Sequence, residues 1–400
     1  MIDARAARNA PDEYRRRLAR KGGAETFDAW LAADERWREL VPKVDDLRSR
    51  TKLKGKPTPE QLEELKGVKE QLQQVEQELA AAEAEREALL TAIPNPPADD
   101  TPDGDTDDDA EEIRRWGEQP QLEDPKEHTE IGRFEMERAA RLSGSRFGYF
   151  VGDTALLALA VHRYALDVVT REGFTPVLPP VLVREEAMYG TGFFPTEKSN
   201  IYALPEDELY LTGTSEVALA GLHMGEILEP AELPLHYAGY SVNFRREAGA
   251  AGKDTRGMFR VHQFYKVEMF TFCAPDASAA EHERILAVEE QILQGLGLPY
   301  RVVNVAAGDL GASAVKKYDC EGWFAYQQRY RELTSTSNTT DFQARRLGIR
   351  ARFDGKNLEP VHTLNGTAVT DRATLAILEN FQGDVPDVLR AFGAPERVER

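Results

Sequence analysis

The clearest pattern along the chain is a series of apolar residues spaced alternately by three and four within the first hundred residues. One series follows this rule at Leu65, Val68, Leu72, Val75, Leu79, Ala82, Leu89 and Ile93, with Arg86 at its one polar position. An upstream series does the same at Trp30, Ala33, Trp37, Leu40, Val44 and Leu47. This spacing is the a/d repeat of a coiled coil, so it predicts two long helices.

A short break rich in glycine and proline separates the two series at residues 51–59. Thr58 and Pro59 suit the N-cap and the first position of the second helix. We therefore expect an antiparallel helical hairpin over residues 1–97, ended by Ile93 and the prolines that follow it. The second helix, about 35 residues at 1.5 Å per residue, would be roughly 50 Å long.

The tip of this predicted hairpin is basic. No acidic residue falls between its first and last cations, which are Arg48, Arg50, Lys52, Lys54 and Lys56. A charged coiled coil can be a solvated spacer or a dimerisation rod. A basic tip on a long arm can also reach the phosphates of a nucleic acid, because lysine and arginine neutralise the backbone charge.

Residues 98–118 contain a strongly acidic stretch. It has nine acidic residues and no basic residue between Asp99 and Glu112. Such a segment predicts a flexible, self-repelling acidic linker. It also carries nearly half of the formal net charge of −19. The net charge therefore does not exclude a nucleic-acid partner, since local charge decides binding.

From residue 119 to 400 the pattern becomes mixed. Residues 150–172 repeat apolar positions every 3.6 residues and predict a helix, whereas short apolar runs predict strands at 177–183, 209–211, 240–244, 264–270 and 300–304. Strands do not alternate regularly with helices. The pattern therefore favours an α+β fold with an antiparallel sheet flanked by helices over a doubly wound one.

The composition excludes several further classes of protein. Of the 400 residues, 41% are hydrophobic and 30% are charged, as in globular proteins. The chain has no apolar run long enough to cross a membrane and no apolar N-terminal signal, so we expect a cytoplasmic protein without a membrane partner. Cys273 and Cys320 are too few for a disulfide framework or a cysteine-rich zinc site, and we expect no zinc.

The densest group of chemically useful residues lies between Phe244 and Glu268. The glycine loops of nucleotide-binding motifs are absent from the sequence, so a bound nucleotide would be held by arginines and carboxylates. Alternation along a strand places Arg245 and Glu247 on one face, and likewise Phe264, Lys266 and Glu268. Arginine suits phosphate, an aromatic face suits a base, and a carboxylate suits an amine. The alternative is a solvated, charged hairpin.

This segment resembles motif 2 of class II aminoacyl-tRNA synthetases, in the form typical of the seryl-tRNA synthetase family. The resemblance covers almost the whole chain: residues 173–180 resemble motif 1, with Pro180 as its proline, and residues 364–380 resemble motif 3, with Arg372 as its arginine. Residues 214–216 and 332–338 are similar to two further segments of the family, and Ile93-Pro-Asn and residues 114–117 to its junction between arm and body.

The resemblance implies a set of site residues. It implies a catalytic role for Arg245, Glu332 and Arg372, and a Mg²⁺ site at Glu332 and Ser335. It implies a pocket for L-serine formed by Thr214, Ser215, Glu216, Glu268, Asn365 and Thr367, without deciding which residue meets the hydroxyl and which the ammonium. It implies an ATP site formed by Arg245, Arg246, Glu247, Val261, Phe264, Glu332, Leu333, Thr334, Ser335 and Arg372.

The activity that the resemblance implies is ATP-dependent activation of L-serine and its transfer to the 3′ end of tRNA(Ser), with tRNA(Sec) as a further acceptor. It also implies a homodimer whose arm recognises the tRNA. Two alternatives remain: a paralogue that activates serine for antibiotic biosynthesis or self-resistance, and a catalytically silent binding protein. Asp371 departs from the small residue usual beside the motif 3 arginine, and pairing with Arg372 is one interpretation of it.

Overall fold

The computed structural model describes residues 1–52, 58–248 and 257–400. Within these ranges the chain divides into two compact units, Met1–Pro96 and Pro97–Arg400. Among the described helices, none combines the length and the apolar content needed to cross a bilayer.

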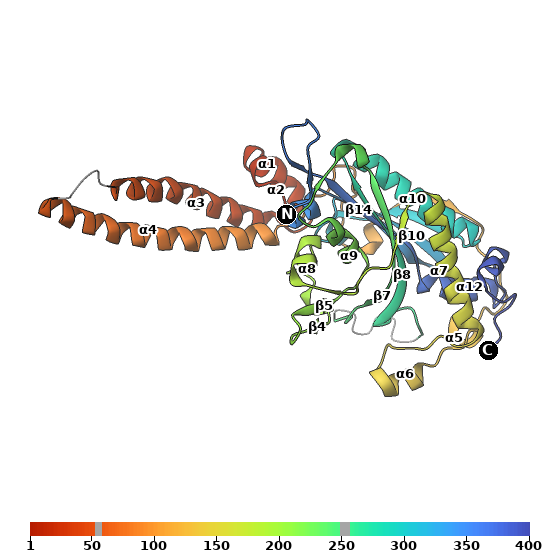
Figure 1. Cartoon of the computed structure of the whole chain (residues 1–400). Coiled ribbons are helices and arrows are strands. Elements are labelled where there is room, and N and C mark those ends of the chain that lie inside the picture. The colour runs from red at the N-terminus through yellow and green to blue at the C-terminus, as the bar shows by residue number, and fades with distance from the viewer. Residues whose placement is uncertain (53–57, 249–256) are drawn as a thin grey trace. The chain divides into compact units, whose positions relative to one another are not determined.

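The first unit is helical and contains the predicted hairpin. Its elements are α1 (Ala4–Asn9), α2 (Pro11–Ala19), α3 (Ala24–Arg50) and α4 (Pro59–Ala92), and α3 and α4 lie side by side (Figure 1). The start of α4 is set by a capping box in which Thr58 and Gln61 each accept a hydrogen bond from the other's backbone N–H. Residues of both predicted apolar series, such as Leu47 and Val68, are buried between the helices.

Arg86, the polar residue of the second series, has a specific partner. Its Nε donates to Asp34 Oδ1 across 2.7 Å, and Arg8 and Arg38 also contact this buried carboxylate, each at 3.0 Å. Burial alone would raise the pKa of Asp34, but the hydrogen bonds from Arg86 and Arg8 outweigh it and lower that pKa. A buried polar pair of this kind fixes the register of two helices, because a shifted register would leave its charges unpaired.

The second unit is built on one large sheet. Its spatial order is β1 (Glu111–Trp116), β9 (Tyr300–Asn304), β10 (Lys316–Phe324), β11 (Arg329–Thr340), β14 (His362–Thr370), β8 (Gln263–Cys273), β7 (Leu235–Phe244) and β2 (Thr175–Val177). Neighbouring strands are antiparallel except β2 and β7, which are parallel. The α+β prediction is confirmed.

Helices α7 (Asp153–Arg171), α10 (Ser278–Gly295) and α12 (Asp371–Phe381) pack against this sheet around the main hydrophobic core (Figure 1). Two small sheets complete the unit, formed by β3 (Leu182–Val183), β5 (Leu209–Leu211) and β4 (Ala203–Leu204), and by β13 (Glu359–Pro360), β12 (Arg350–Ala351) and β6 (Ile227–Leu228). The shorter helices are α5 (His128–Ile131), α6 (Met136–Ser143), α8 (Glu185–Thr191), α9 (Glu216–Ala220) and α11 (Phe342–Leu347).

The prediction of a flexible linker over residues 98–118 is wrong. The acidic stretch belongs to the second unit: Ala98 N donates to Val315 O across 2.8 Å, and β1 forms the edge of the main sheet beside β9. Ion pairs offset part of its negative charge, since Arg115 contacts Glu112 at 2.5 Å. Ladder hydrogen bonds and these pairs together outweigh the self-repulsion on which the prediction rested.

Candidate active site

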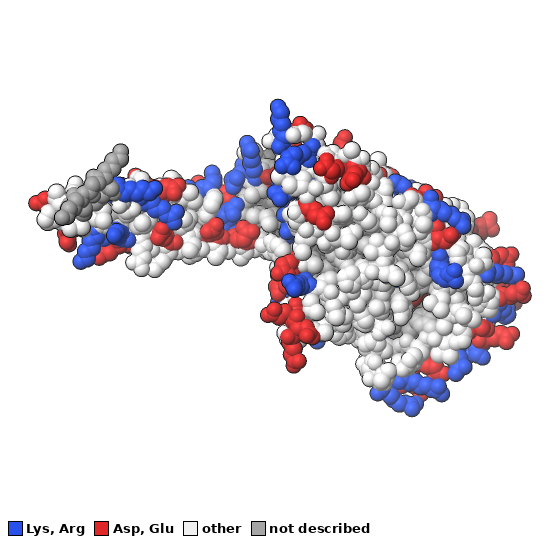
Figure 2. Space-filling model, viewed as in Figure 1, with Lys and Arg blue, Asp and Glu red and all other residues white. Residues whose placement is uncertain are grey.

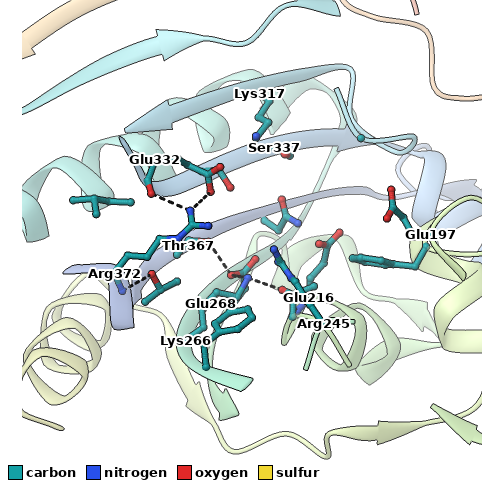
Figure 3. Close-up of a pocket in the computed structure, with 18 of the residues that line it drawn as sticks. Glu197, Glu216, Arg245, Lys266, Glu268, Lys317, Glu332, Ser337, Thr367 and Arg372 are labelled. Atoms are coloured by element: carbon teal, nitrogen blue, oxygen red, sulfur yellow. Dashed lines mark hydrogen bonds and ion pairs between the residues drawn. The ribbon is translucent and has the colours of Figure 1, made fainter. Parts of the chain in front are cut away.

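A cavity of about 310 Å³ opens on the main sheet of the second unit (Figure 3). Strands β8, β11 and β14, the segment just after β7 and the starts of α9 and α12 supply much of its wall. The structure brings most of the predicted site residues together here, namely Thr214, Glu216, Arg245, Glu247, Val261, Phe264, Glu268, Glu332, Leu333, Ser335, Asn365, Thr367 and Arg372.

Three other predicted residues direct their side chains elsewhere. Ser215 Oγ is buried and lies 2.6 Å from Ser241 Oγ. The hydroxyl of Thr334 donates to the buried Glu289 across 2.8 Å. Arg246 is exposed, with its guanidinium carbon 5.7 Å from the centre of the Tyr202 ring. A contact of these side chains with a molecule in the cavity is therefore not supported.

A β-bulge explains how Glu332 and Ser335 come to share the cavity. Residues three apart in a regular strand face opposite sides of a sheet. The pairing of β10 with β11 shifts between Cys320 and Glu321, which pair with Thr334 and Glu332, so Leu333 is an extra residue. The bulge restores Glu332 and Ser335 to one face, and both line the cavity.

A second bulge has the same effect in β14. Its register against β8 shifts between Thr367 and Val369, so Ala368 is extra, and Thr367 and Thr370 both line the cavity. Thr370 then caps α12 by accepting a hydrogen bond from Arg372 N at 3.3 Å. The bulge and the cap together set Arg372 at the cavity wall.

Part of the cavity wall is rich in arginine. Arg372 Nη1 donates to the backbone oxygen and to Oε1 of Glu332, at 3.0 and 3.3 Å, and its guanidinium carbon lies 4.4 Å from the centre of the Phe259 ring. Burial lowers the pKa of Arg372, an effect that the charge of Glu332 opposes. Burial would raise the pKa of Glu332, but the charge of Arg372 first, and then nearby lysine and arginine charges, lower it. Glu332 is therefore an anion held among cations.

Arg245 and Phe264 form an adjoining part of the wall. Arg245 Nε donates to Gly213 O across 3.1 Å, and its guanidinium carbon lies 5.1 Å from the centre of the Phe264 ring. Nearby, Arg260 Nη1 contacts Glu247 Oε2 at 2.6 Å. The contacts of Arg260 and Phe259 were not predicted from sequence, because only the folded chain places them against Glu247 and Arg372.

Two carboxylates in the cavity wall are buried. Glu216 and Glu268 are only 8% and 2% exposed. Gln343 Nε2 donates to Glu216 Oε1 across 2.7 Å, and Thr367 Oγ1 donates to Glu268 Oε2 across 3.3 Å. Burial, followed by the charge of Glu268, raises the pKa of Glu216 to about 7. Two carboxylates enclosed in this way suit an ammonium group and a hydroxyl group.

Asp371 does not pair with Arg372, so that interpretation is corrected. In the described part of the chain its Oδ2 accepts a hydrogen bond from Tyr265 N at 2.8 Å, while Oδ1 lies 3.5 Å from His162 Nε2. The first turn of α12 thus directs the two side chains apart, and Arg372 stays available to the cavity.

The predicted basic tip of the first unit is only partly described. Arg48 contacts Glu76 at 2.8 Å, and Arg50 lies 3.8 Å from Asp46. Lys52 is exposed. Lys54 and Lys56 lie outside the described residues.

An antiparallel sheet whose cavity gathers the predicted motif 2 and motif 3 residues is the arrangement expected of a class II aminoacyl-tRNA synthetase, and the family models agree. Residues 200–381 match the tRNA synthetase class II core domain (G, H, P, S and T), and residues 1–97 match the seryl-tRNA synthetase N-terminal domain. The chain belongs to the seryl-tRNA synthetase family.

Similar proteins cover the chain from end to end. A serine–tRNA ligase of Mycolicibacterium vanbaalenii is 47% identical over 395 residues, which is 96% of this chain and 94% of that protein. Serine–tRNA ligase 1 of Streptomyces avermitilis is 47% identical over 426 residues, 100% of this chain and 99% of the relative.

Two solved structures share the fold. The seryl-tRNA synthetase of Pyrococcus horikoshii complexed with ATP has a TM-score of 0.93 at 37% identity and covers 100% of this chain and 99% of its own. The cytoplasmic serine–tRNA ligase of Naegleria fowleri in complex with AMP has a TM-score of 0.87 at 31% identity. It covers 97% of this chain and 95% of its own.

Proposed function

We propose that the protein is a serine–tRNA ligase that activates L-serine with ATP and transfers the seryl group to the 3′ end of tRNA(Ser). The observation that carries this proposal is one cavity whose wall combines Arg245 and Arg372 with the enclosed carboxylates Glu216 and Glu268. The names of the relatives favour a tRNA acceptor over an acceptor in antibiotic biosynthesis or self-resistance.

The activation step needs orientation and charge stabilisation rather than a general base. The serine carboxylate is already ionised, so its oxygen attacks the α-phosphorus of ATP while the bond to pyrophosphate breaks. Arg245 holds the α-phosphate and the carboxylate together, and Arg372 binds the γ-phosphate. These fixed charges stabilise the transition state, because they are already oriented by Gly213 and Glu332 before ATP binds.

The base of ATP fits the wall next to Arg245. Phe264 offers an aromatic face for stacking, and Glu247 with the backbone of Val261 offers hydrogen bonds to the adenine edge. Arg260 holds Glu247 in place through the 2.6 Å contact.

Glu332 and Ser335 fit a magnesium site. The bulge at Leu333 gives them one face of β11, and a carboxylate with a hydroxyl is the oxygen donor set that Mg²⁺ prefers. Among the described residues no group of three or more histidine, cysteine, aspartate or glutamate side chains could hold a metal alone, so phosphate oxygens would complete the shell. Bound there, Mg²⁺ would neutralise phosphate charge.

The two buried carboxylates fit the amino acid. Glu216 and Glu268 supply acceptors for the serine ammonium and hydroxyl groups, and Thr214, Asn365 and Thr367 add polar contacts. A small apolar amino acid would leave these buried groups unpaired, which costs about 1–3 kcal/mol for each group. The pocket therefore favours serine over alanine.

We further propose that the protein acts as a homodimer and that its arm binds tRNA. The exposed side of α7 and the segment after β2 present Leu156, Leu159, Leu178 and Leu182, which are 39–81% exposed. Figure 2 shows a broad area without charge on one face of the second unit. Exposed leucines of this kind mark an interface, and the family resemblance in motif 1 makes a second copy its partner.

The proposed activity is tested in two steps with the purified full chain. Serine should support exchange of labelled pyrophosphate into ATP, and alanine should not. Tritiated serine should then become attached to tRNA(Ser). Exchange without tRNA charging would support the biosynthetic paralogue, and the absence of both would support a silent binding protein.

A further inference from the structure

Lys266 is a cation enclosed beside the two buried carboxylates of the cavity. It lies on β8 two residues before Glu268, so the two side chains share a face, and it is only 5% exposed. An ammonium group removed from water in this way is costly unless it is paired and hydrogen-bonded. The groups that contact Lys266 therefore indicate the role of its positive charge.

Both partners of Lys266 belong to the proposed serine pocket. Its Nζ donates to Thr214 Oγ1 across 2.6 Å and forms an ion pair with Glu268 Oε2. Figure 3 shows Lys266, Glu216 and Glu268 gathered at the same end of the cavity. Thr367 contacts the same oxygen of Glu268, at 3.3 Å, so two groups hold one side of this carboxylate. Both of these contacts are to Oε2, and among the described residues none is seen at Oε1, which leaves that oxygen for a substrate.

The contact with Lys266 also determines which hydrogen bonds the Thr214 hydroxyl can form with a substrate. A hydroxyl oxygen has two lone pairs and one hydrogen. Thr214 Oγ1 accepts from Glu216 N at 3.2 Å and from Lys266 Nζ at 2.6 Å, so both lone pairs are used. Its hydrogen is left to donate, which suits an oxygen of the amino acid and not its ammonium group.

The charges around the two carboxylates come from every side of the pocket. Glu216 on α9 and Glu268 on β8 face each other, Arg245 lies after β7, Glu332 lies on β11, and Glu289 approaches from α10. Burial and the charge of Glu268 raise the pKa of Glu216 to about 7, and the charge of Lys266 opposes this rise. Burial raises the pKa of Glu289 well above its usual range, which disfavours its charged form.

We infer that Lys266 is a positioning residue of the serine pocket, which holds Glu268 as a fixed acceptor and Thr214 as a fixed donor and balances one of the two enclosed carboxylates. The inference rests on the proposed serine–tRNA ligase activity. With Lys266 in place the pocket keeps one unbalanced negative charge for the ammonium of the substrate. Without it, the two carboxylates share a proton that competes with that ammonium.

The test compares Lys266→Met with the parent in serine-dependent pyrophosphate exchange from pH 6 to pH 9. We expect kcat/KM for serine to fall at least 100-fold at pH 7, mainly through KM. The KM for ATP should change less than threefold. The acid limb of the pH profile should move to higher pH. Lys266→Arg, which keeps the charge, should regain at least a tenth of the parental value and its pH profile.

A matched control is Lys316→Met, which removes a lysine that pairs with Asp100 on the surface of the same unit. It should leave both Michaelis constants unchanged. Equal losses for serine and ATP in Lys266→Met, or an unshifted pH profile, would overturn the inference. If Lys266→Met fails to fold, a Lys266→Arg enzyme with a shifted acid limb would overturn it equally. A parent enzyme without serine-dependent exchange would instead refute the proposed function.

Discussion

His128 Nδ1 donates a hydrogen bond to Glu379 Oε1 across 2.7 Å, and both side chains are buried. Met258 N donates to the other ring nitrogen, Nε2, across 3.1 Å. Because Nε2 accepts this bond, the imidazole is neutral and carries its hydrogen on Nδ1. The pair thus connects the end of α12 to Met258, at the cavity wall next to Phe259 and Arg260.

We expect His128→Ala to weaken ATP binding although His128 does not line the cavity. The change frees Met258 N and leaves the Glu379 carboxylate buried without this partner, at a cost of about 2–3 kcal/mol in the free energy of unfolding. The KM for ATP should rise more than the KM for serine. His128→Asn, which can still donate to Glu379, should recover most of the stability. A urea titration and exchange kinetics check this, and an unchanged KM for ATP in His128→Ala would contradict it.

Glu289 provides a pH-dependent test of burial. It is fully buried, and its Oε2 accepts from Thr334 Oγ1 at 2.8 Å. Burial raises its pKa well above the usual range, so the folded chain holds this proton more tightly than the unfolded chain does. The stability that this proton contributes is complete below the unfolded pKa of about 4.3 and is lost as pH rises toward the folded pKa, by at most about 1.4 kcal/mol per pH unit.

Glu289→Gln should remove this dependence, because an amide does not titrate. The stability of the variant relative to the parent should therefore increase as the pH rises above the unfolded pKa of about 4.3, as measured by urea unfolding. The exposed Glu359→Gln serves as the control and should show a constant difference. A constant difference for Glu289→Gln as well would mean that folding does not raise the pKa of Glu289.

Periodicity predicted the arm and the helix of residues 153–171 because each has one continuous apolar face. It did not predict β10, β11 or β14 as strands. Their cavity faces carry residues such as Lys317, Glu332 and Thr367, which interrupt an apolar alternation. The motifs located most of the site, but the bulges at Leu333 and Ala368 arise only from pairing with neighbouring strands. Lys266 was placed on the correct face, whereas its contact with Thr214 joins residues 52 positions apart.

The arm should contribute to tRNA binding and not to serine activation. Replacing Lys52, Lys54 and Lys56 by serine should leave pyrophosphate exchange unchanged and raise the KM for tRNA. If each lysine meets one phosphate, the slope of log affinity against log salt should fall by about 0.7–0.9 for each lost contact. Lys43→Ser, on α3 away from the tip, is the control and should leave the KM for tRNA unchanged. Normal charging of tRNA by the triple variant at physiological salt would show that the tip is only a solvated turn.

If the protein is a dimer as proposed, a charge placed at one exposed leucine should dissociate it. Leu159 is 55% exposed on α7, so Leu159→Glu should cost the isolated chain little stability and should shift sedimentation from dimer to monomer. Leu142→Glu, at a leucine that is 74% exposed on α6, should leave the dimer intact. A parent protein that sediments as a monomer at micromolar concentration, with full charging activity, would refute the dimer.

The most direct test of serine recognition by this cavity is Glu268→Gln, assayed by serine-dependent pyrophosphate exchange alongside calorimetric ATP binding. Glu268 is 2% exposed and lines the same cavity as Arg245 and Arg372, the arginines proposed to hold ATP. The amide gives up a charged acceptor and leaves Lys266 without its ion pair. We predict a loss of at least 100-fold in kcat/KM for serine, about 2.7 kcal/mol, with ATP affinity changed less than threefold. Equal losses in serine exchange and ATP binding would contradict the assignment of Glu268 to the amino acid.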